Sequence, residues 1–168
     1  DLEQSKTQAA YVMPSHQYPT GIVMPVKRRQ ELLSWAYRGE NRYVIEDDYD
    51  SELRLSGQPI PALQSIDLSE KVIYMNTFTK TLASTVRISY MILPRPLLEQ
   101  FYQKLSFYSC TVSNFEQYTL DLFIKEGYFE KHINRLRNYY QNKKNGFLSA
   151  IWDSGLHKCV EISGEEAG

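Results

Sequence analysis

Short apolar runs alternate along the chain with amphipathic helical patterns. The apolar runs are expected to be strands, and they lie at 11–13, 42–47, 71–76 and 86–93. The three longer runs are apolar on both faces, which is typical of strands that helices cover on both sides. Strands that alternate with helices in this way predict an α/β fold with a mostly parallel sheet in three layers, flanked by helices.

The predicted helices carry apolar residues at helical spacing and recognisable end signals. The first spans 27–38, with Leu32, Leu33, Trp35 and Ala36 facing inward, and ends before Gly39. A second opens at 94–96 (Pro-Arg-Pro), and Ser113 with Glu116 forms the pattern of a capping box for a third. A long final helix should end near Gly155. It carries an apolar stripe at Phe129, Ile133, Leu136, Tyr140, Phe147 and Ile151.

Composition narrows the class of protein. The chain has 168 residues, of which 42% are hydrophobic, enough for one domain with a core. Its 19 basic and 20 acidic residues give a net charge of -1, which argues against nucleic-acid binding by this segment. Cys110 and Cys159 form no CxxC pair and are interpreted as reduced thiols of a cytoplasmic protein, and no apolar run reaches membrane-spanning length. Both ends are expected to be cuts within a longer chain.

An acidic run follows the strand at 42–47. If Tyr43 and Ile45 share one side of that strand, Asp47 continues the same side. A carboxylate at the carboxyl end of a strand can hold a pyridinium N–H, and Tyr49 could donate a hydrogen bond to a phenolate oxygen of the same ring. Taken alone, the run is better explained as an acidic loop, a metal site or a solvated turn.

A lysine among hydroxyl residues follows the next strand. Lys80 comes after Thr77 and Thr79, so its amine could form an imine while the hydroxyls hold a phosphate. Arg87, seven residues on, is expected at the start of a strand, where its planar fork suits a phosphate. The alternatives are an ordinary surface lysine and an internal salt bridge from Arg87 to Asp47 or Asp50. Together the three strand-end motifs are far more specific than any one of them.

These motifs resemble the aminotransferase-like domain of the MocR/GabR-type regulators, a branch of the GntR superfamily. The resemblance rests on SHQYPTGIVMPVKRRQELLSWA, YVIEDDYDSEL, IPALQSID, VIYMNTFTKTL, VRISYMILP and KHINRLRNYYQNKKNGFLSAI, and it covers roughly 11–165. It implies part of the large domain of the fold-type-I pyridoxal 5'-phosphate (PLP) transferase fold. In that reading 1–150 is the central and C-terminal part of the large domain, and 151–168 begins a truncated small domain.

The resemblance also implies a role for each motif residue. Lys80 would carry PLP as a Schiff base, Asp47 would face the pyridine nitrogen, and Tyr49 would approach the ring hydroxyl oxygen. Phosphate would be held by Thr77, Thr79 and Arg87. No metal ligand set is expected, since the three histidines do not cluster with the cysteines at zinc spacings.

Three hypotheses about function remain open. In the first, the chain belongs to the effector domain of a homodimeric transcriptional regulator, which senses a small amino compound or amino acid by aldimine exchange at Lys80. DNA would be bound only through a winged-helix domain that is absent from this chain. In the second, the protein is a catalytically active class I/II aminotransferase. In the third, the isolated fragment is inactive and binds nothing.

Overall fold

The computed structural model describes residues 2–55 and 60–160. The chain divides into two compact units, one of residues 1–51 and 60–112 and the other of residues 52–59 and 113–168. Each unit is described by itself. The expected start of a small domain at 151 falls inside a continuous helix. Residues 161–168, the last part of the segment 151–168 assigned to that domain, lie outside the described residues.

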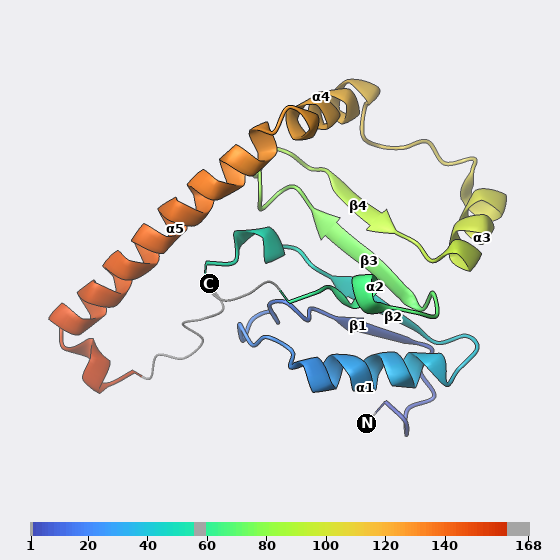
Figure 1. Cartoon of the computed structure of the whole chain (residues 1–168), viewed down its shortest axis with the longest axis horizontal. Helices are drawn as coiled ribbons and strands as arrows, with labels where there is room; N and C mark the ends of the chain where they lie inside the picture. Colours follow the sequence, from blue (N-terminus) through green and yellow to red (C-terminus); the bar gives the residue numbers. More distant parts are fainter. Residues whose placement is uncertain (1, 56–59, 161–168) are drawn as a thin grey trace. The chain divides into compact units, whose positions relative to one another are not determined.

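A four-stranded sheet forms the centre of the first unit. Its strands, in spatial order, are β1 (Ala9–Val12), β2 (Tyr43–Asp47), β3 (Val72–Thr77) and β4 (Ser89–Ile92). The first three are parallel and β4 runs antiparallel to β3, as the arrows in Figure 1 show. The predicted mostly parallel sheet is therefore confirmed, and each of the four predicted strands is present.

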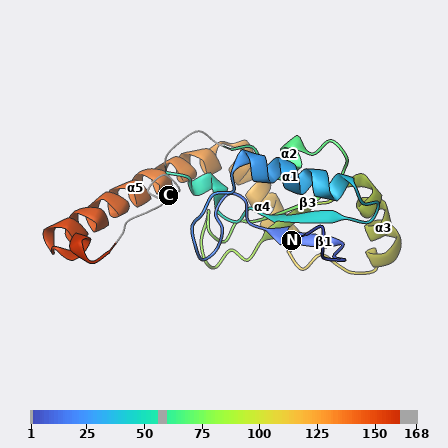
Figure 2. The ribbon, with the colours of Figure 1, turned by 90° about the horizontal axis from the view of Figure 1, so that it is seen from below.

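Two helices pack on one face of this sheet. They are α1 (Val26–Tyr37) and the single turn α2 (Leu63–Ile66), which lie along the same side of the strands in Figure 2. The predicted inward residues are all buried, because their spacing places them on the side of α1 that meets the sheet. The core consists of Ala10, Leu32, Leu33, Trp35, Ala36, Val44, Leu63 and Val72.

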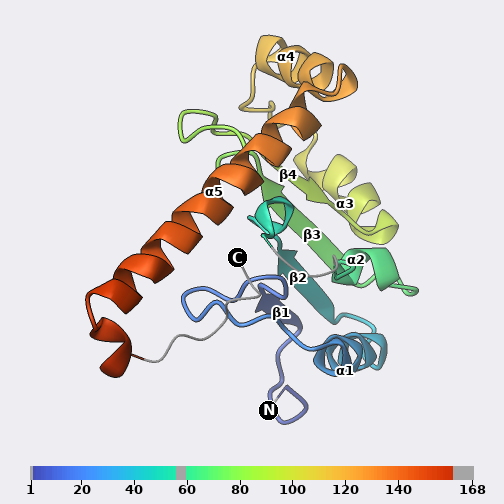
Figure 3. The same ribbon diagram turned by 60° about the vertical axis from the view of Figure 1, so that its left-hand side comes forward.

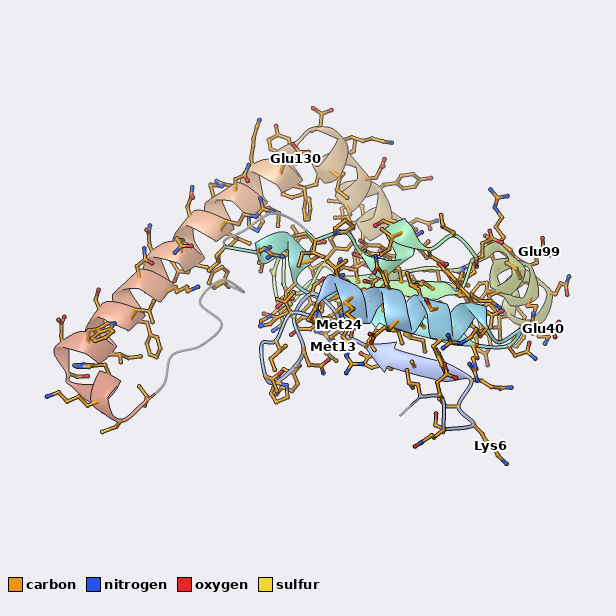
Figure 4. All side chains as sticks on the ribbon, turned by 60° about the horizontal axis from the view of Figure 1, so that its bottom comes forward. Lys6, Met13, Met24, Glu40, Glu99 and Glu130 are labelled. Carbon is orange, nitrogen blue, oxygen red and sulfur yellow. The ribbon has the colours of Figure 1, made fainter. Side chains whose placement is uncertain are left out.

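A buried arginine fastens the loop that leads into α1. The guanidinium of Arg29 donates hydrogen bonds to the carbonyl oxygens of Met24 (3.1 Å), Pro61 (2.9 Å) and Pro14 (2.8 Å). The backbone N–H of Met24 also donates to Pro14, which explains why Met13 and Met24 lie side by side in Figure 4. The loop is thus held at both ends, although it contains little regular structure.

The last strand of the sheet is shorter than the sequence predicts. A strand over 86–93 is expected, but β4 begins only at Ser89 and ends at Ile92. All four of its residues are exposed within the described chain, so the expected cover on both faces is not present on β4. After it, α3 (Arg95–Leu105) begins with Pro96 in its first turn, as predicted.

The second unit is built mainly from two helices, α4 (Asn114–Lys125) and α5 (Tyr128–Asp153). The predicted capping box is present: the N–H of Glu116 donates to the Ser113 hydroxyl, and the Glu116 carboxylate accepts from the N–H of Ser113. Gly127 joins the two helices with a left-handed φ of 72°. Figure 3 shows α5 as one unbroken helix, and Gly155 follows its end with φ 76°, as predicted.

Two one-turn 3-10 helices complete the described elements, at Ser51–Leu53 and Leu156–Lys158. Within the second unit, the guanidinium of Arg137 on α5 donates to the carbonyl oxygen of Glu52 at 2.7 Å. Of the predicted stripe on α5, Ile133 is buried while Phe147 is largely exposed. In the described part of the chain, no helix has the length and apolar character needed to cross a membrane.

Candidate functional site

The two consecutive acids at the end of β2 point to opposite faces of the sheet. Val44 and Glu46 are fully buried on the side of α1, whereas Tyr43, Ile45 and Asp47 are only half-buried. This alternation follows from the pleat of the strand. It confirms that Asp47 continues the face of Tyr43 and Ile45, the face of the sheet turned away from α1.

A tyrosine on the neighbouring strand holds Asp47. The hydroxyl of Tyr11 on β1 donates a hydrogen bond to the Oδ2 of Asp47. This bond, together with burial and the charge of the carboxylate, raises the pKa of Tyr11 to about 12. Tyr11 therefore stays protonated at neutral pH and acts as a permanent donor to Asp47. The sequence analysis missed Tyr11, although its place in the strand beside the acidic run was the available signal.

Tyr49 is tied to the loop that precedes α1. Its hydroxyl donates to the carbonyl oxygen of His16 at 3.1 Å, and the two rings are stacked with centroids 6.1 Å apart. Next to it, the Nδ1 of His16 lies 2.7 Å from the Oδ2 of Asp50. Burial, with the nearby charges of Asp50 and Asp47, raises the pKa of Tyr49. Since a hydroxyl has one proton, Tyr49 can donate to a cofactor oxygen only by releasing His16.

The two threonines of the lysine motif bind the backbone on both sides of Arg87. The Thr79 hydroxyl donates to the carbonyl oxygen of Val86 at 2.9 Å, and the Thr77 hydroxyl lies 3.2 Å from that of Ile88. The Thr77 hydroxyl also accepts from the N–H of Thr79 at 3.2 Å. Thr77 and Thr79 thus lie close to the backbone of the segment that contains Arg87, and their hydroxyls contact the carbonyl groups on either side of it.

These contacts also explain why β4 starts late. The N–H of Phe78 donates to Ile88 at 2.9 Å, and the N–H of Val86 donates to Ala83 at 3.0 Å. The backbone at 86–88 is therefore bonded to residues 77–83, and the Thr79 hydroxyl takes the carbonyl of Val86 in place of a strand partner. The expectation that Arg87 begins a strand is wrong: it lies in this turn, two residues before β4.

Both cations of the site are exposed. Lys80 and Arg87 lie in the turn segments after β3 and before β4. Among the residues that the structure describes, neither side chain forms a hydrogen bond or an ion pair, so the alternative of a salt bridge from Arg87 to Asp47 or Asp50 is not observed. Two unpaired cations beside one turn form a local positive region that suits an anion.

A buried polar network supports the site from the α1 side of the sheet. Asp48 accepts hydrogen bonds at its Oδ2 from the hydroxyls of Tyr74 (2.8 Å) and Ser51 (2.7 Å), and Asn76 donates to Tyr74 at 3.0 Å. Burial raises the pKa of Tyr74, so its hydroxyl remains a donor. The network joins the residues just before the Tyr49 loop to the end of β3. In the sequence, the sign of this network is Asn76, a polar residue at the end of an apolar strand, which needs hydrogen-bond partners if it is buried.

Glu46 fixes another part of the same framework. Its carboxylate accepts hydrogen bonds from the backbone N–H groups of Leu63 (2.8 Å) and Gln64 (2.9 Å) at the start of α2. Burial raises the pKa of Glu46, and these two bonds together with the charge of Arg29 act in the opposite direction. Glu46 therefore has a structural role, and only Asp47 of the pair is available to a ligand.

The register places the motif residues at one edge of the sheet. Asp47 pairs with Met75 on β3, two residues before Thr77, and Thr79 contacts the segment that contains Arg87. The backbone positions of Asp47, Lys80 and Arg87 thus lie at or close to the carboxyl ends of the parallel strands β2 and β3, the usual ligand site of such sheets. Among residues 2–55 and 60–160, no group of three or more acidic, histidine or cysteine side chains could hold a metal ion.

The arrangement also fits PLP in its chemistry. The ring nitrogen needs a carboxylate, the phosphate needs cations and hydrogen-bond donors, and the aldehyde needs an amine. Asp47, Arg87 and Lys80 supply these groups, and each is at least partly accessible. The donor set is therefore the one that a pyridine ring with a phosphate arm requires.

Solved structures define the class of fold. The chain matches a kynurenine aminotransferase of Pyrococcus horikoshii with a TM-score of 0.77 and 33% identity, over 89% of this chain and 37% of that one. A multiple substrate aminotransferase of Thermococcus profundus matches with the same TM-score and 30% identity, over 90% of this chain and 38% of that one. The chain thus has the fold of the fold-type-I, PLP-dependent aminotransferases.

Curated relatives narrow the class further. The chain is 46% identical over 167 residues to YdeL of Bacillus subtilis, an HTH-type transcriptional regulator, covering 99% of this chain and 36% of YdeL. It is 40% identical over 168 residues to MocR of Rhizobium meliloti, named as a probable rhizopine catabolism regulatory protein, covering 100% of this chain and 34% of MocR. No family model matches. These findings support an aminotransferase-like domain of a MocR-type regulator.

The chain spans about a third of the length of these relatives. The comparison therefore concerns the aminotransferase-like domain, and the activity and partners of the complete protein are proposals.

Proposed function

We propose that this chain is the lysine-bearing part of a PLP-binding effector domain, in a MocR/GabR-type transcriptional regulator that senses a small amino compound. The observation that carries the proposal is the turn after β3. There two threonines hold the backbone around Arg87, and within the described residues the side chains of Lys80 and Arg87 have no hydrogen-bond or ion-pair partner. An exposed lysine that has no hydrogen-bond or ion-pair partner among the described residues, and that lies just after a parallel strand, is suited to bind a phosphorylated aldehyde.

Each residue has a distinct role in this proposal. Bound PLP would supply an aldehyde carbon that Lys80 would hold through its amine, and a free amine that took this place would release the Lys80 amine. Asp47 accepts the N–H of the ring and keeps it protonated. Arg87 binds the phosphate, with Thr77 and Thr79 beside it. Tyr49 binds the ring hydroxyl oxygen once it has released His16.

The rest of the proposal concerns the complete protein. YdeL is an HTH-type regulator by name, and in this proposal DNA would be bound by such a domain elsewhere in the polypeptide. We further propose that the protein is a homodimer and that residues 151–168 begin the small domain. Replacement of Lys80 by an amino compound would then be the local event that changes the state of the regulator.

An active aminotransferase is the second candidate function. It is favoured by 32% identity over 152 residues to aromatic-amino-acid aminotransferase 1 of Thermococcus litoralis. In that case the Lys80 amine, once released, would also move the proton of the substrate Cα. Among the described residues no hydrogen bond holds the Lys80 amine, so it could take up this role. Formation of an oxo acid from amino acids by the full-length protein would favour the enzyme. Binding to DNA that changes with the amino compound would favour the regulator.

The direct test is covalent labelling. The full-length protein is mixed with PLP, reduced with borohydride and digested, and the modified peptide is identified by mass spectrometry. We expect the label on Lys80, and we expect Lys80→Ala to lose both the label and the visible absorption. The exposed Lys6, shown in Figure 4, provides the control, since Lys6→Ala should label like the wild type. Labelling at another lysine, or at none, would refute the proposal.

Arg87→Ala tests the phosphate role separately. Loss of one charge-assisted contact to phosphate should weaken PLP binding by about 10- to 100-fold. Equal affinity in the variant and the wild type would show that Arg87 has only a structural role.

A further inference from the structure

The hydrogen bond between Tyr11 and Asp47 joins two strands on the face that carries the site. Tyr11 pairs with Ile45 in the parallel register of β1 and β2, and Asp47 is the next residue of β2 on that same face. The phenol reaches diagonally along the sheet, and its hydroxyl donates to the Oδ2 of Asp47. A residue 36 positions earlier in the chain therefore determines where one oxygen of the carboxylate lies.

The two oxygens of Asp47 differ in their surroundings. Within the described residues, Oδ2 is the oxygen bonded to Tyr11, and no side chain or backbone donor is bonded to Oδ1. A carboxylate that is held at one oxygen presents the other in a fixed direction. Asp47 is only half-buried, so its side chain is partly accessible on the face of the sheet turned away from α1.

We infer that Tyr11 is a positioning residue, which holds the Asp47 carboxylate so that its second oxygen meets the ring N–H of PLP. This inference rests on the proposed function. Tyr11 acts through Asp47 and does not itself bind the ring. Its raised pKa, about 12, is consistent with this role because the hydroxyl remains a donor over the whole neutral range.

The position of Tyr11 favours a role in the site over a role in the core. Its side chain is 55% exposed in the described chain, and it is not part of the buried cluster under α1. Replacing it with phenylalanine removes the hydroxyl and keeps the ring, so the strand and its packing are preserved. A defect of that variant can therefore be assigned to the lost hydrogen bond.

The test uses Tyr11→Phe in the full-length protein and two ligands. The first is PLP, and the second is its 1-deaza analogue, in which CH replaces the ring nitrogen. We expect the variant to bind PLP about fivefold more weakly, the effect of one partly exposed hydrogen bond to a charged group. Binding of the deaza analogue should be unchanged relative to wild type, because that ring has no N–H for Asp47 to accept.

Tyr37→Phe is the matched control. The Tyr37 hydroxyl also donates to an aspartate, Asp67 at 3.0 Å, but away from the residues assigned to the cofactor. Its removal should leave both affinities unchanged. Equal weakening of PLP and the deaza analogue by Tyr11→Phe, no weakening of either, or the same weakening by Tyr37→Phe would overturn the inference.

Failure of the inference can be distinguished from failure of the proposed function. If Tyr11 is unimportant but PLP binds, borohydride still labels Lys80 in both wild type and Tyr11→Phe. If the proposed function is wrong, the wild-type protein is not labelled at Lys80, whatever residue stands at position 11.

Discussion

The substitution Glu46→Gln tests how the framework of the site is held. The Glu46 side chain is 0% exposed and accepts two backbone N–H groups at the start of α2. Glutamine has nearly the same shape but only one acceptor oxygen, and its NH₂ group would face the second N–H. One backbone donor therefore loses its partner inside the protein.

The expected cost follows from these contacts. An unsatisfied buried donor costs about 1–3 kcal/mol. Two features reduce this free-energy cost. The Gln64 N–H is only partly buried, and a neutral glutamine does not pay the cost of burying a charge, which is what raises the pKa of Glu46. We therefore expect Glu46→Gln to destabilise the start of α2 by about 1.5 kcal/mol, or roughly tenfold in a local opening equilibrium.

Amide hydrogen exchange is the appropriate assay, because it reports local opening even in a protein of several domains. The amides of Leu63 and Gln64 should exchange about tenfold faster in Glu46→Gln. Glu31→Gln is the control. Among the described residues, exposed Glu31 makes an i,i+3 ion pair with Arg28 and no other ion pair, so the substitution should change stability by less than about 0.5 kcal/mol. Wild-type exchange rates at both amides would refute the reasoning.

Two further predictions concern the open face and the turn. Thr79→Val removes the hydrogen bond to the carbonyl of Val86, just before Arg87, and should weaken PLP binding about threefold to tenfold in calorimetry. Thr119→Val is the control, because it removes a similar bond on an exposed helix and should leave PLP affinity unchanged. Equal PLP affinities of Thr79→Val and the wild type would contradict a role for the Thr79 hydroxyl in holding the segment around Arg87. Asp47→Ala should lower the pKa of Tyr11 from about 12 toward 10.0, measured by NMR titration of ring-labelled tyrosine, and an unchanged pKa would contradict the assigned bond. Because folding raises this pKa, the contribution of Tyr11 to stability is complete below pH 10 and is lost as the pH rises through about 12.

The local features of the fold were predictable from the sequence because they depend on nearby residues. The inward face of α1, the capping box at Ser113 and the glycine after α5 each follow from spacing within a few residues. The start of β4 was not predictable in this way. It depends on threonine hydroxyl groups that bond to backbone carbonyls 7 and 11 residues later, on either side of Arg87, and the hydrophobic pattern carries no information about such bonds.

The face of the sheet on which Asp47 lies was predictable, but most contacts of the candidate-site residues were not. Strand alternation placed Asp47 correctly, because the pleat fixes which side of the sheet each residue faces. The contacts of Tyr11 with Asp47 and of Tyr49 with His16 join segments more than thirty residues apart. They arise from the register of β1 against β2 and from the path of the loop before α1, which no single stretch of sequence specifies.

Glu46 and Asp47 are consecutive on β2, so the face on which each carboxylate lies depends on the number of residues in the strand. Glu46 lies on the α1 side of the sheet and Asp47 on the opposite face because consecutive residues of a pleated strand point to opposite sides. Inserting or deleting one residue between Tyr43 and Glu46 would exchange their sides, leaving a carboxylate at each place but with side chains of the wrong length. In homologous proteins, length changes should therefore be excluded from this strand even where its individual apolar residues vary.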